Sequence, residues 1–499
     1  MQQVAADQPY DPRRAWTILA ICCTALFMTT LDSTILNTAL PALQRGLHAT
    51  NAGLQWAVDG YVVVRVSTLF LCGSIGDRYG RRRTFGIGLV LFVTGSLACG
   101  LAPSIGGLIA FRCFQGLGSA VLTPASLGII TNTFVDRKRR AMAVGVWSAT
   151  TGLSMGVGPV LGGFLVEDFG WRSVFLVNVP IGLVALAATR VLMESKAAAP
   201  RPLDFPGQFS IGGSLFLATY ALISAPIVGW GSPVTLTMFV AAVVLFGVFV
   251  TVEARTTQPM LPLSIVKNRG LTGSFLLAVI AFLAFGAFLF FNTLYLQEVR
   301  GMSPLKAGLL ILPTTAVALV LSPISGHLTG TRGARFPAGL ATLLTAVGMG
   351  MLAITLSATT PIYLLLIAYL LVGFGQGLIN PPLTNAAVSG LPRDQAGVAG
   401  AIMTTARQIG TNLGIALVGA VIFSVATSLN NAQHVANRAL STSHGGANYV
   451  IGVRYGDLLA GALSLLTFGI AWYAFAPRFE GTHDPETGQF IANATGRPV

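Results

Sequence analysis

Five ionisable side chains lie inside apolar stretches of this sequence, where a charge is expensive. They are Asp32, Asp59, Arg65, Arg112 and Arg407. A charged side chain at the centre of a membrane span costs at least about 2.5–3.5 kcal/mol, so each of these residues indicates a functional site by default. Acids and arginines in such surroundings can exchange protons or bind the polar groups of a ligand.

Three of these residues are expected at a similar depth. If the first apolar run crosses outward and the next inward, Asp32, Asp59 and Arg112 each lie about six residues from the outer end of their run. At about 1.5 Å per residue this places all three roughly 9 Å below the outer surface. Either aspartate could therefore pair with Arg112. An aspartate that alternates between an arginine and water would change its affinity for protons, as proton coupling requires. The alternative is a fixed ion pair that holds helices together.

Arg65 lies near the middle of the second apolar run, six residues after Asp59. Six residues correspond to a rotation of about 240° on a helix, so the two side chains do not share a face. Arg65 could contact a polar or anionic substrate, or it could pair with an acid on another span.

The composition is that of a membrane protein. The chain has 499 residues, of which 53% are hydrophobic and 9% charged, and its mean hydropathy is +0.73. Soluble domains are about 25% charged. The net charge of +13 comes from basic residues in short loops between apolar runs, which argues against nucleic-acid binding. The five cysteines lack metal-ligand spacing, and neither a metal site nor disulfides are expected.

About fourteen runs are long and apolar enough to span a membrane. They lie near residues 16–38, 53–75, 84–103, 106–132, 141–166, 173–193, 208–230, 233–252, 271–297, 303–327, 336–358, 361–390, 396–428 and 455–476. An even number places both termini on one side. Most Lys and Arg residues fall on that same side, and basic loops stay cytoplasmic, so both termini are expected in the cytoplasm.

The chain divides into two halves around an insertion. We expect an N-terminal six-helix bundle at 1–193, linkers and an inserted hairpin at 194–270, a C-terminal six-helix bundle at 271–476 and a cytoplasmic tail at 477–499. The glycine spacing of residues 73–80 returns at 326–333, and LIAFRCF (108–114) resembles LIAYLLV (366–372). Parallel repeats of this kind predict a binding site near the bilayer midplane at the interface of the halves.

Several motifs resemble those of one transporter family. GSIGDRYGRRRTF (73–85) resembles the signature loop of the major facilitator superfamily, and RCFQGLGSA (112–120) its fourth-span arginine motif. LDSTILNTALP (31–41), WRSVFLVNVPIG (171–182) and LYLQEVRGMSPLKAGLLILP (294–313) resemble its fourteen-span drug:proton antiporter branch. The resemblance implies an all-α membrane protein with the major facilitator fold, in which two six-helix bundles and an inserted two-helix hairpin give fourteen transmembrane helices.

The resemblance assigns the signature loop a mechanical role. It implies a conformational latch on the cytoplasmic side in which the acid of the loop meets the start of the thirteenth span, around residues 395–400. A carboxylate is favourable at a helix N-terminus, and glycines allow close approach. The latch residues are Gly73, Asp77, Arg78, Gly80 and Arg81.

The fifth apolar run contains GLSMGVGPVLGG, which resembles the antiporter motif of the family. Small residues spaced four apart let helices pack closely, which is the plain structural explanation. The resemblance implies in addition that this packing seals the site against leak. The residues of the motif are Gly152, Gly156, Gly158, Pro159, Gly162 and Gly163.

The family resemblance implies that Asp32 and Arg112 handle protons, and Asp59 is a further candidate for this role. Span nine is rich in phenylalanine, and aromatic surface with few polar groups suits lipophilic ligands. The candidate residues of a substrate cavity are Arg65, Asn37, Phe288 and Asn292.

Together these features predict a proton-coupled antiporter that exports lipophilic, drug-like or antibiotic compounds by alternating access. The alternative is a proton-coupled exporter or importer of a specific metabolite on the same fold. We expect no cofactor beyond the proton gradient, a monomer in the plasma membrane, and no enzyme activity, since the sequence lacks a nucleotide-binding loop and a paired His/Glu metal motif.

Overall fold

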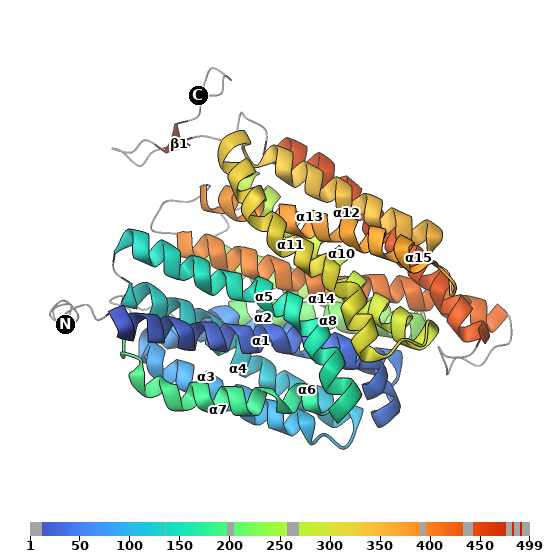
Figure 1. Cartoon of the computed structure of the whole chain (residues 1–499), viewed down its shortest axis with the longest axis horizontal. Helices are drawn as coiled ribbons and strands as arrows, with labels where there is room; N and C mark the ends of the chain where they lie inside the picture. The colour runs from blue at the N-terminus through green and yellow to red at the C-terminus, as the bar shows by residue number, and fades with distance from the viewer. Residues whose placement is uncertain are drawn as a thin grey trace. The chain divides into compact units, whose positions relative to one another are not determined.

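The computed structural model describes residues 12–134, 136–196, 204–256, 269–389, 396–432, 443–475, 482–483 and 490–491. Nearly all of these residues are helical (Figure 1). The described strands are β1 (Thr482–His483) and β2 (Phe490–Ile491), which pair antiparallel.

Helices of the first half match the expected apolar runs. They are α1 (Pro12–Leu47), α2 (Asn51–Tyr79), α3 (Arg81–Gly100), α4 (Ile105–Thr133), α5 (Arg137–Phe169), α6 (Ser173–Leu176), α7 (Asn178–Ala188) and the 3₁₀ turn η1 (Thr189–Val191). The sixth run is confirmed as one candidate span, Ser173–Val191. Its helices α6 and α7 meet at Val177, whose backbone stays helical with φ at −60° and ψ at −28°, and Asn178 is the first residue of α7.

Helices of the second half follow the same order. They are α8 (Phe205–Val228), α9 (Pro233–Arg255), α10 (Arg269–Leu294) with the π-helical turn η3 (Tyr295–Val299), α11 (Pro304–Arg332), α12 (Arg335–Thr355), α13 (Ile362–Ser389), α14 (Ala396–Ala432) and α15 (Ser443–Ala474). The last helix starts twelve residues before the expected position 455. The expected start was wrong because Asn448 and Arg454 lower the hydropathy of the first turns of this helix.

Side-chain caps explain where several helices begin. The side chains of Thr50, Ser104, Asp136 and Ser303 each accept a backbone N–H from the residue three positions further on. Such caps satisfy one of the N–H groups that have no partner inside the helix. In α11 the next residue, Pro304, has no N–H to satisfy and suits the first helical position.

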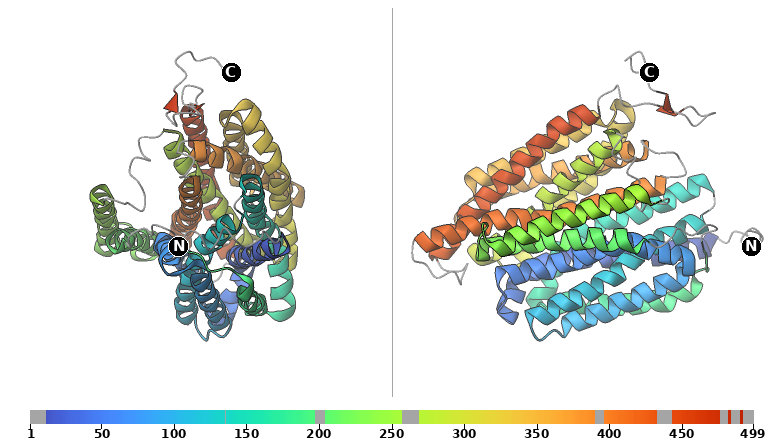
Figure 2. Two further views of the ribbon diagram at one scale, coloured as in Figure 1. Left: turned by 90° about the vertical axis from the view of Figure 1, so that its left-hand side faces the viewer. Right: turned by 180° about the vertical axis from the view of Figure 1, so that it is seen from behind.

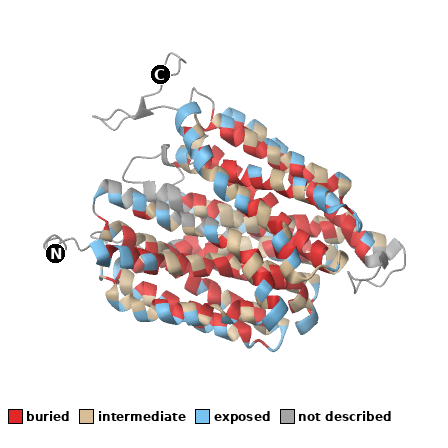
Figure 3. Ribbon diagram, in the orientation of Figure 1, coloured by how far each residue is buried: buried red, intermediate tan, exposed pale blue. Residues whose placement is uncertain are grey.

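Among the described residues, twelve helices are long and apolar enough to cross a membrane, and α2 makes thirteen if its two bent parts count as one span. Their outer faces carry apolar side chains that are largely exposed, such as Phe209 (74%), Val243 (71%) and Ile354 (75%). Exposed residues alternate with buried ones along these helices (Figure 3). Apolar side chains on the outside suit a lipid environment, so the chain is a multi-pass membrane protein.

The chain forms two compact units. Unit 1 comprises residues 1–217 and 241–260, and unit 2 comprises residues 218–240 and 261–499. The two units therefore share α8 and α9: residues 205–217 and 241–255 belong to unit 1, and the segment between them to unit 2. The sequence-based boundaries at 193 and 270 stay predictions.

Close helix packing defines unit 1, in which α4 contacts both α2 and α3, and α1 contacts α5 (Figure 2). Glycines permit the approach of α3 and α4. A Cβ atom added at Gly118 would lie 2.5 Å from the backbone nitrogen of Phe92, and one added at Gly95 would lie 2.8 Å from Cα of Gln115. These contacts bring the polar residues of the two helices together.

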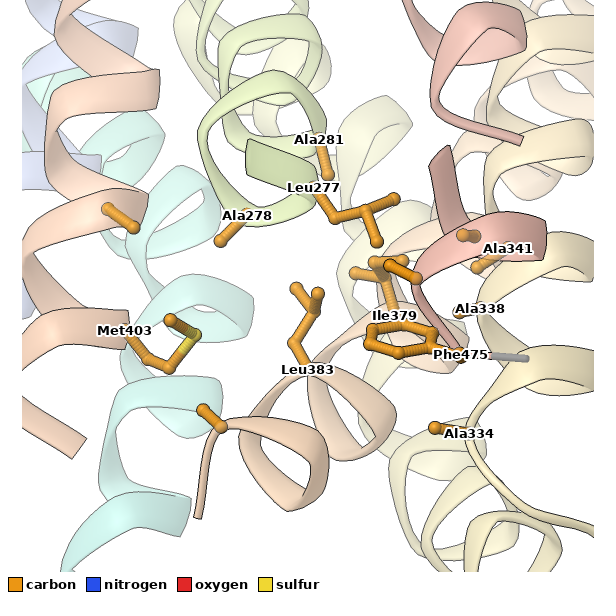
Figure 4. Packing of buried hydrophobic residues seen from close by; sticks show 14 of the residues in the cluster. Leu277, Ala278, Ala281, Ala334, Ala338, Ala341, Ile379, Leu383, Met403 and Phe475 are labelled. Atoms are coloured by element: carbon orange, nitrogen blue, oxygen red, sulfur yellow. The ribbon is translucent and has the colours of Figure 1, made fainter. Parts of the chain in front are cut away.

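Unit 2 has the same arrangement of helix pairs. Helix α13 contacts α11 and α12, while α15 contacts α10, α12 and α14. Its core includes side chains from α10, α12, α13, α14 and α15, some of which are shown in Figure 4: Leu277, Ala278, Ala281, Ala334, Ala338, Ala341, Ile379, Leu383, Met403 and Phe475. Many of these are alanines, which lets the helices approach closely.

Helix α2 bends by 50° between its parts 51–69 and 71–79. At the bend the backbone N–H of Leu71 donates to Oε1 of Gln208, on α8, at 3.1 Å. Further along α8, the ring of Phe216 lies 5.4 Å from that of Trp56. A side chain that accepts a backbone N–H inside a helix is a recognised cause of such a bend.

Candidate functional site

A buried ion pair joins α1 and α4 in the interior of unit 1. The guanidinium of Arg112 donates through Nη1 to Oδ2 of Asp32. Asp32 is 0% and Arg112 1% exposed, so the pair is shielded from solvent. The sequence left two partners open for Arg112, and the structure pairs it with Asp32.

Two amide side chains complete the surroundings of Asp32. Nε2 of Gln115 and Nδ2 of Asn178 each donate to Oδ1 of Asp32 at 2.9 Å. The same two nitrogens donate to Oγ of Ser96 at 3.1 Å and 3.0 Å. Helices α1, α3, α4 and α7 thus meet in one polar network, which we call the Asp32 network: Asp32, Ser96, Arg112, Gln115 and Asn178.

Helix α2 holds the other side of Arg112. Nε of Arg112 donates to the carbonyl oxygen of Ala57 at 3.0 Å, and its guanidinium lies 4.1 Å from the ring centroid of Tyr61. Nη1 also donates to Oε1 of Gln115 at 2.8 Å. Hydrogen bonds of this kind are needed to make a buried ion pair tolerable, because desolvation of two charges costs several kcal/mol per ion.

Asp59 does not join this network. Residues 57 and 61 are one turn apart on the face of α2 that contacts Arg112, and position 59 is on another face. Asp59 is fully buried, and neither of its carboxyl oxygens has a hydrogen-bond partner among the residues that the structure describes. The expected alternative of an Asp59–Arg112 pair is therefore wrong.

Arg65 follows Tyr61 by one turn on α2 and is 5% exposed. Its Nη2 donates to Oγ1 of Thr123, on α4, at 3.3 Å. Arg65 therefore contacts α4 through this hydroxyl group. Its two expected roles, a contact with a polar or anionic substrate and a pair with an acid on another span, stay predictions.

The signature loop forms a compact cluster at the junction of α2 and α3. Oδ1 of Asp77 accepts Nη2 of Arg81 at 2.8 Å and Nε at 3.0 Å. Nη1 of Arg81 donates to the carbonyl oxygen of Gly128, on α4, at 3.1 Å. Asp77 therefore pairs with Arg81 and not with Arg78. Gln395 and the side chains of 396–400 lie outside the described residues, so the latch contact stays a prediction.

Glu194 holds the start of α3 from the other side. Its carboxylate accepts the backbone N–H groups of Arg82 at 3.1 Å and Arg83 at 3.3 Å. Gly80 precedes the helix with φ at 116°, a conformation that favours glycine, and a Cβ there would lie 2.5 Å from Oε1 of Glu194. A carboxylate at this helix end also suits the helix dipole.

Glycines of the fifth-run motif form the contact between α5 and α1. A Cβ atom at Gly158 would clash with Thr34, and one at Gly162 would clash with Thr38 and Ile35. Gly158, Pro159, Gly162 and Gly163 are buried. The packing function expected of this motif is thus visible at two of its six positions. Its role in preventing leak stays a prediction.

The aromatic stretch of α10 lies in the interior of unit 2. The rings of Phe288 and Tyr369 form a T-shaped pair with their centroids 5.1 Å apart, and the Tyr369 hydroxyl donates to Oδ1 of Asn292 at 2.9 Å. Phe288 and Asn292 are 1% and 0% exposed. In unit 1 the fourth cavity candidate, Asn37, has its Oδ1 buried without a hydrogen-bond partner among the residues that the structure describes.

Unit 2 contains a small cavity where α10, α12, α13 and α15 meet, with a volume of about 10 Å³. In chain order these helices correspond to α1, α3, α4 and α7, which hold the Asp32 network. The cavity is lined by neutral residues: Ala281, Ala341, Thr342, Thr345, Gln376, Ile379, Ser464 and Thr467. The two halves therefore differ in charge at corresponding crossings.

The sequence did not single out four of the residues that build these sites: Ser96, Gln115, Asn178 and Glu194. Gln115 follows Arg112 by three residues, so both share a helix face, and that spacing was a usable signal. Asn178 is an isolated amide in an otherwise apolar run. Glu194 begins a polar segment whose composition is typical of a linker. Within the described residues, no group of three His, Cys, Asp or Glu side chains could hold a metal ion.

Comparison with known proteins agrees with these observations. The chain is 38% identical over 413 residues to the tetracenomycin C resistance and export protein of Streptomyces glaucescens, covering 82% of this chain and 76% of that protein. It is 38% identical over 400 residues to the multidrug resistance protein Stp of Mycobacterium tuberculosis, covering 80% and 74%. It is 34% identical over 489 residues to the puromycin resistance protein pur8 of Streptomyces alboniger, covering 97% and 95%.

Solved structures share the fold at low sequence identity. A bacterial homologue of the human lysosomal transporter Spinster, in an inward-facing and unoccupied conformation, has a TM-score of 0.67 at 18% identity, covering 93% of this chain and 98% of that one. The peptide transporter POT in complex with sulfate has a TM-score of 0.65 at 14% identity, covering 95% and 99%. The family model of the Major Facilitator Superfamily matches residues 22–415. The chain therefore belongs to the major facilitator superfamily.

Proposed function

We propose that this protein exports lipophilic, drug-like or antibiotic compounds in exchange for protons. The observation that carries the proposal is the buried Asp32–Arg112 pair inside apolar helices. Membership of a transporter family and similarity to proteins named for drug resistance and export support the export of drugs.

Asp32 is the proposed proton carrier. In its ionised form it is held by Arg112, Gln115 and Asn178. Protonation removes the charge that holds Arg112, so the pair must separate or rearrange when a proton arrives. An acid whose partner changes in this way links proton binding to the arrangement of α1 and α4. Asp59, which is buried and has no hydrogen-bond partner among the described residues, is the second proposed carrier.

Alternating access requires a device that stabilises one state. We assign this role to the cluster of Asp77, Arg81 and Glu194, in which the start of α3 is fixed to the end of α2 and to the segment after η1. The predicted contact of Asp77 with the start of α14 would add the second half of the latch. The glycine contacts between α5 and α1 are proposed to limit leak.

The proposed transporter has fourteen spans, namely the twelve candidate spans, the bent helix α2 and the 33-residue helix α5. We propose that both termini lie in the cytoplasm and that the protein is a monomer in the plasma membrane. The proton gradient supplies the energy without a cofactor. Arg65, Asn37, Phe288 and Asn292 are the proposed substrate contacts.

A second candidate function is the transport of a specific polar metabolite by the same mechanism. The observation that favours it is Arg65, a buried arginine inside an apolar helix that donates to the Thr123 hydroxyl at 3.3 Å. A guanidinium is a strong hydrogen-bond donor and suits an anionic or hydrogen-bond-accepting ligand. Arg65→Ala would change the substrate profile under this function and leave it unchanged if Arg65 is structural.

The proposal is tested in everted membrane vesicles with an acidified lumen and a pH-sensitive dye. Lipophilic cations, neutral antibiotics and anions are added in turn to vesicles with wild-type protein or Asp32→Asn. We expect at least one class to cause alkalinisation of the lumen in the wild type and none in the variant. A response that survives in Asp32→Asn would exclude Asp32 as the carrier. If none of the three classes of compound alkalinises the lumen of wild-type vesicles, the proposal of drug–proton exchange would be overturned.

A further inference from the structure

The Asp32 network offers the carboxylate of Asp32 hydrogen-bond donors only. Oδ2 faces the guanidinium of Arg112, and Oδ1 accepts one N–H from Gln115 and one from Asn178. This set of partners suits the ionised carboxylate. A protonated carboxyl group becomes a donor itself, so it needs an acceptor within reach.

Most acceptors of the network are occupied. Oε1 of Gln115 accepts Nη1 of Arg112 at 2.8 Å. Oγ of Ser96 accepts two N–H groups and donates its own proton to the carbonyl oxygen of Phe175 at 2.9 Å. The exception is Oδ1 of Asn178, which is buried and has no hydrogen-bond partner within the described part of the chain. A buried polar atom without a partner costs about 1–3 kcal/mol.

The orientation of the Asn178 amide follows from its neighbours. Its Nδ2 lies 2.9 Å from Oδ1 of Asp32 and 3.0 Å from Oγ of Ser96, and both atoms can accept. A half-turn of the amide would exchange its nitrogen and oxygen. Oδ1 would then face Asp32, where it could accept the hydrogen bond of the protonated carboxyl group.

We infer that Asn178 is a positioning residue that serves both protonation states of Asp32. Its Nδ2 donates to the ionised carboxylate, and after a half-turn its Oδ1 accepts the O–H of the protonated acid. The proton added to Asp32 stays on that carboxyl group, and no other covalent bond changes. The inference rests on the proposed role of Asp32 as the proton carrier.

Few other side chains near Asp32 could accept a hydrogen bond from its protonated carboxyl group. The other titratable groups that face Asp32 are Arg112 from α4, Tyr61 from α2 and Cys99 from α3. Tyr61 already donates its hydroxyl to the carbonyl oxygen of Thr29 at 3.3 Å, and Cys99 lies 3.8 Å from Oε1 of Gln115. Asn178 alone among these neighbours combines a donor to Asp32 with an unused acceptor.

Infrared difference spectroscopy between neutral and acidic pH tests the switch directly. The samples are the full-length protein in lipid nanodiscs as wild type, Asp32→Asn, Asn178→Leu and Asn178→Thr, with Gln376→Leu in unit 2 as the control for loss of a buried amide. In the wild type we expect a protonated-acid C=O band, absent in Asp32→Asn, together with a shifted side-chain amide band. Gln376→Leu should keep both bands.

The variants at position 178 decide the inference. Asn178→Leu should lack the shifted amide band, and its acid band should move to higher frequency because the acceptor is lost. Asn178→Thr, whose hydroxyl both donates and accepts, should return the acid band towards its wild-type position even if Asn178→Leu folds poorly. An acid band that is unmoved in both variants would overturn the role of Asn178. A wild type without any band that depends on Asp32 would instead overturn Asp32 as the carrier.

Discussion

At the scale of single residues, the two buried aspartates of unit 1 differ in their partners. Asp32 receives hydrogen bonds from Arg112, Gln115 and Asn178. Both carboxyl oxygens of Asp59 are buried and receive no hydrogen bond from the residues that the structure describes. An isolated buried carboxylate is far too costly to persist, so such a group is expected to be neutral. Removing one member of a buried ion pair leaves the other charge without compensation.

We therefore expect Asp32→Asn and Asp59→Asn to differ in stability. Asp32→Asn should destabilise the protein by about 3–5 kcal/mol because Arg112 becomes an unpaired buried charge. Asp59→Asn replaces one neutral side chain by another of similar size and should cost less than about 1 kcal/mol. Thermal unfolding of both variants in lipid nanodiscs measures the difference. Equal losses would show that Asp59 carries a charge in the folded protein.

Asp77 provides a case in which stability and activity should separate. Its ion pair with Arg81 is partly exposed, with side-chain exposures of 33% for Asp77 and 19% for Arg81. Such pairs contribute about 0–1 kcal/mol. Asp77→Asn should therefore leave the unfolding temperature and membrane insertion nearly unchanged while transport falls, because the proposed latch is weakened. Normal flux in vesicles that contain the inserted variant would remove the latch role.

At the scale of elements, α8 has a contact that suggests more than filling space. Gln208 is 4% exposed, and its Oε1 accepts the N–H of Leu71 where α2 bends. The bend lies between the part of α2 that carries Asp59 and Arg65 and the part that leads to Asp77. The geometry of both sites on α2 thus depends on a side chain from α8.

We expect Gln208→Leu to lower transport and to destabilise the protein by about 1–3 kcal/mol, because the part-buried N–H of Leu71 loses this acceptor. Phe209→Leu is the matched control. Phe209 follows Gln208 on α8, and its side chain is 74% exposed, so the protein should tolerate the change. Transport in vesicles and thermal unfolding report the two effects. If both variants behave like the wild type, Gln208 does not support the bend.

The sequence predicted the helices well and the site only in part. Long apolar runs identify spans by length alone, and the pairing of Asp32 with Arg112 was one of two options left by their depth. Whether Arg112 pairs with Asp32 or with Asp59 depends on which face of α2 meets α4. Counting residues along a span gives the depth of a side chain but not the face on which it lies. Asn178 was missed because a single amide in an apolar run does not indicate which neighbouring helix its side chain faces. The start of α15 was misplaced because polar residues inside that helix resemble a loop.

At the scale of the whole molecule, the two units repeat an arrangement of helices but not its chemistry. Four helices of unit 1 enclose a buried ion pair, and their counterparts in unit 2 enclose a neutral cavity of about 10 Å³. Oε1 of Gln376 and Oγ of Ser464 face that cavity without partners in the described residues. A cation there would have no carboxylate to compensate its charge, whereas a space of this size suits one water molecule.

This asymmetry predicts that proton coupling depends on unit 1 alone. Gln115→Leu and Gln376→Leu remove a buried amide from corresponding helices, α4 and α13. Gln115→Leu should impair drug-induced proton movement, since Asp32 loses a donor at 2.9 Å and Arg112 an acceptor at 2.8 Å. Gln376→Leu should keep the number of protons moved per substrate, because its Nε2 donates only to the carbonyl oxygen of Ala281 at 3.2 Å, away from any ion pair of the described residues. Parallel dye and substrate fluxes in vesicles give that number for both variants. A lower number in Gln376→Leu would place part of the proton path in unit 2.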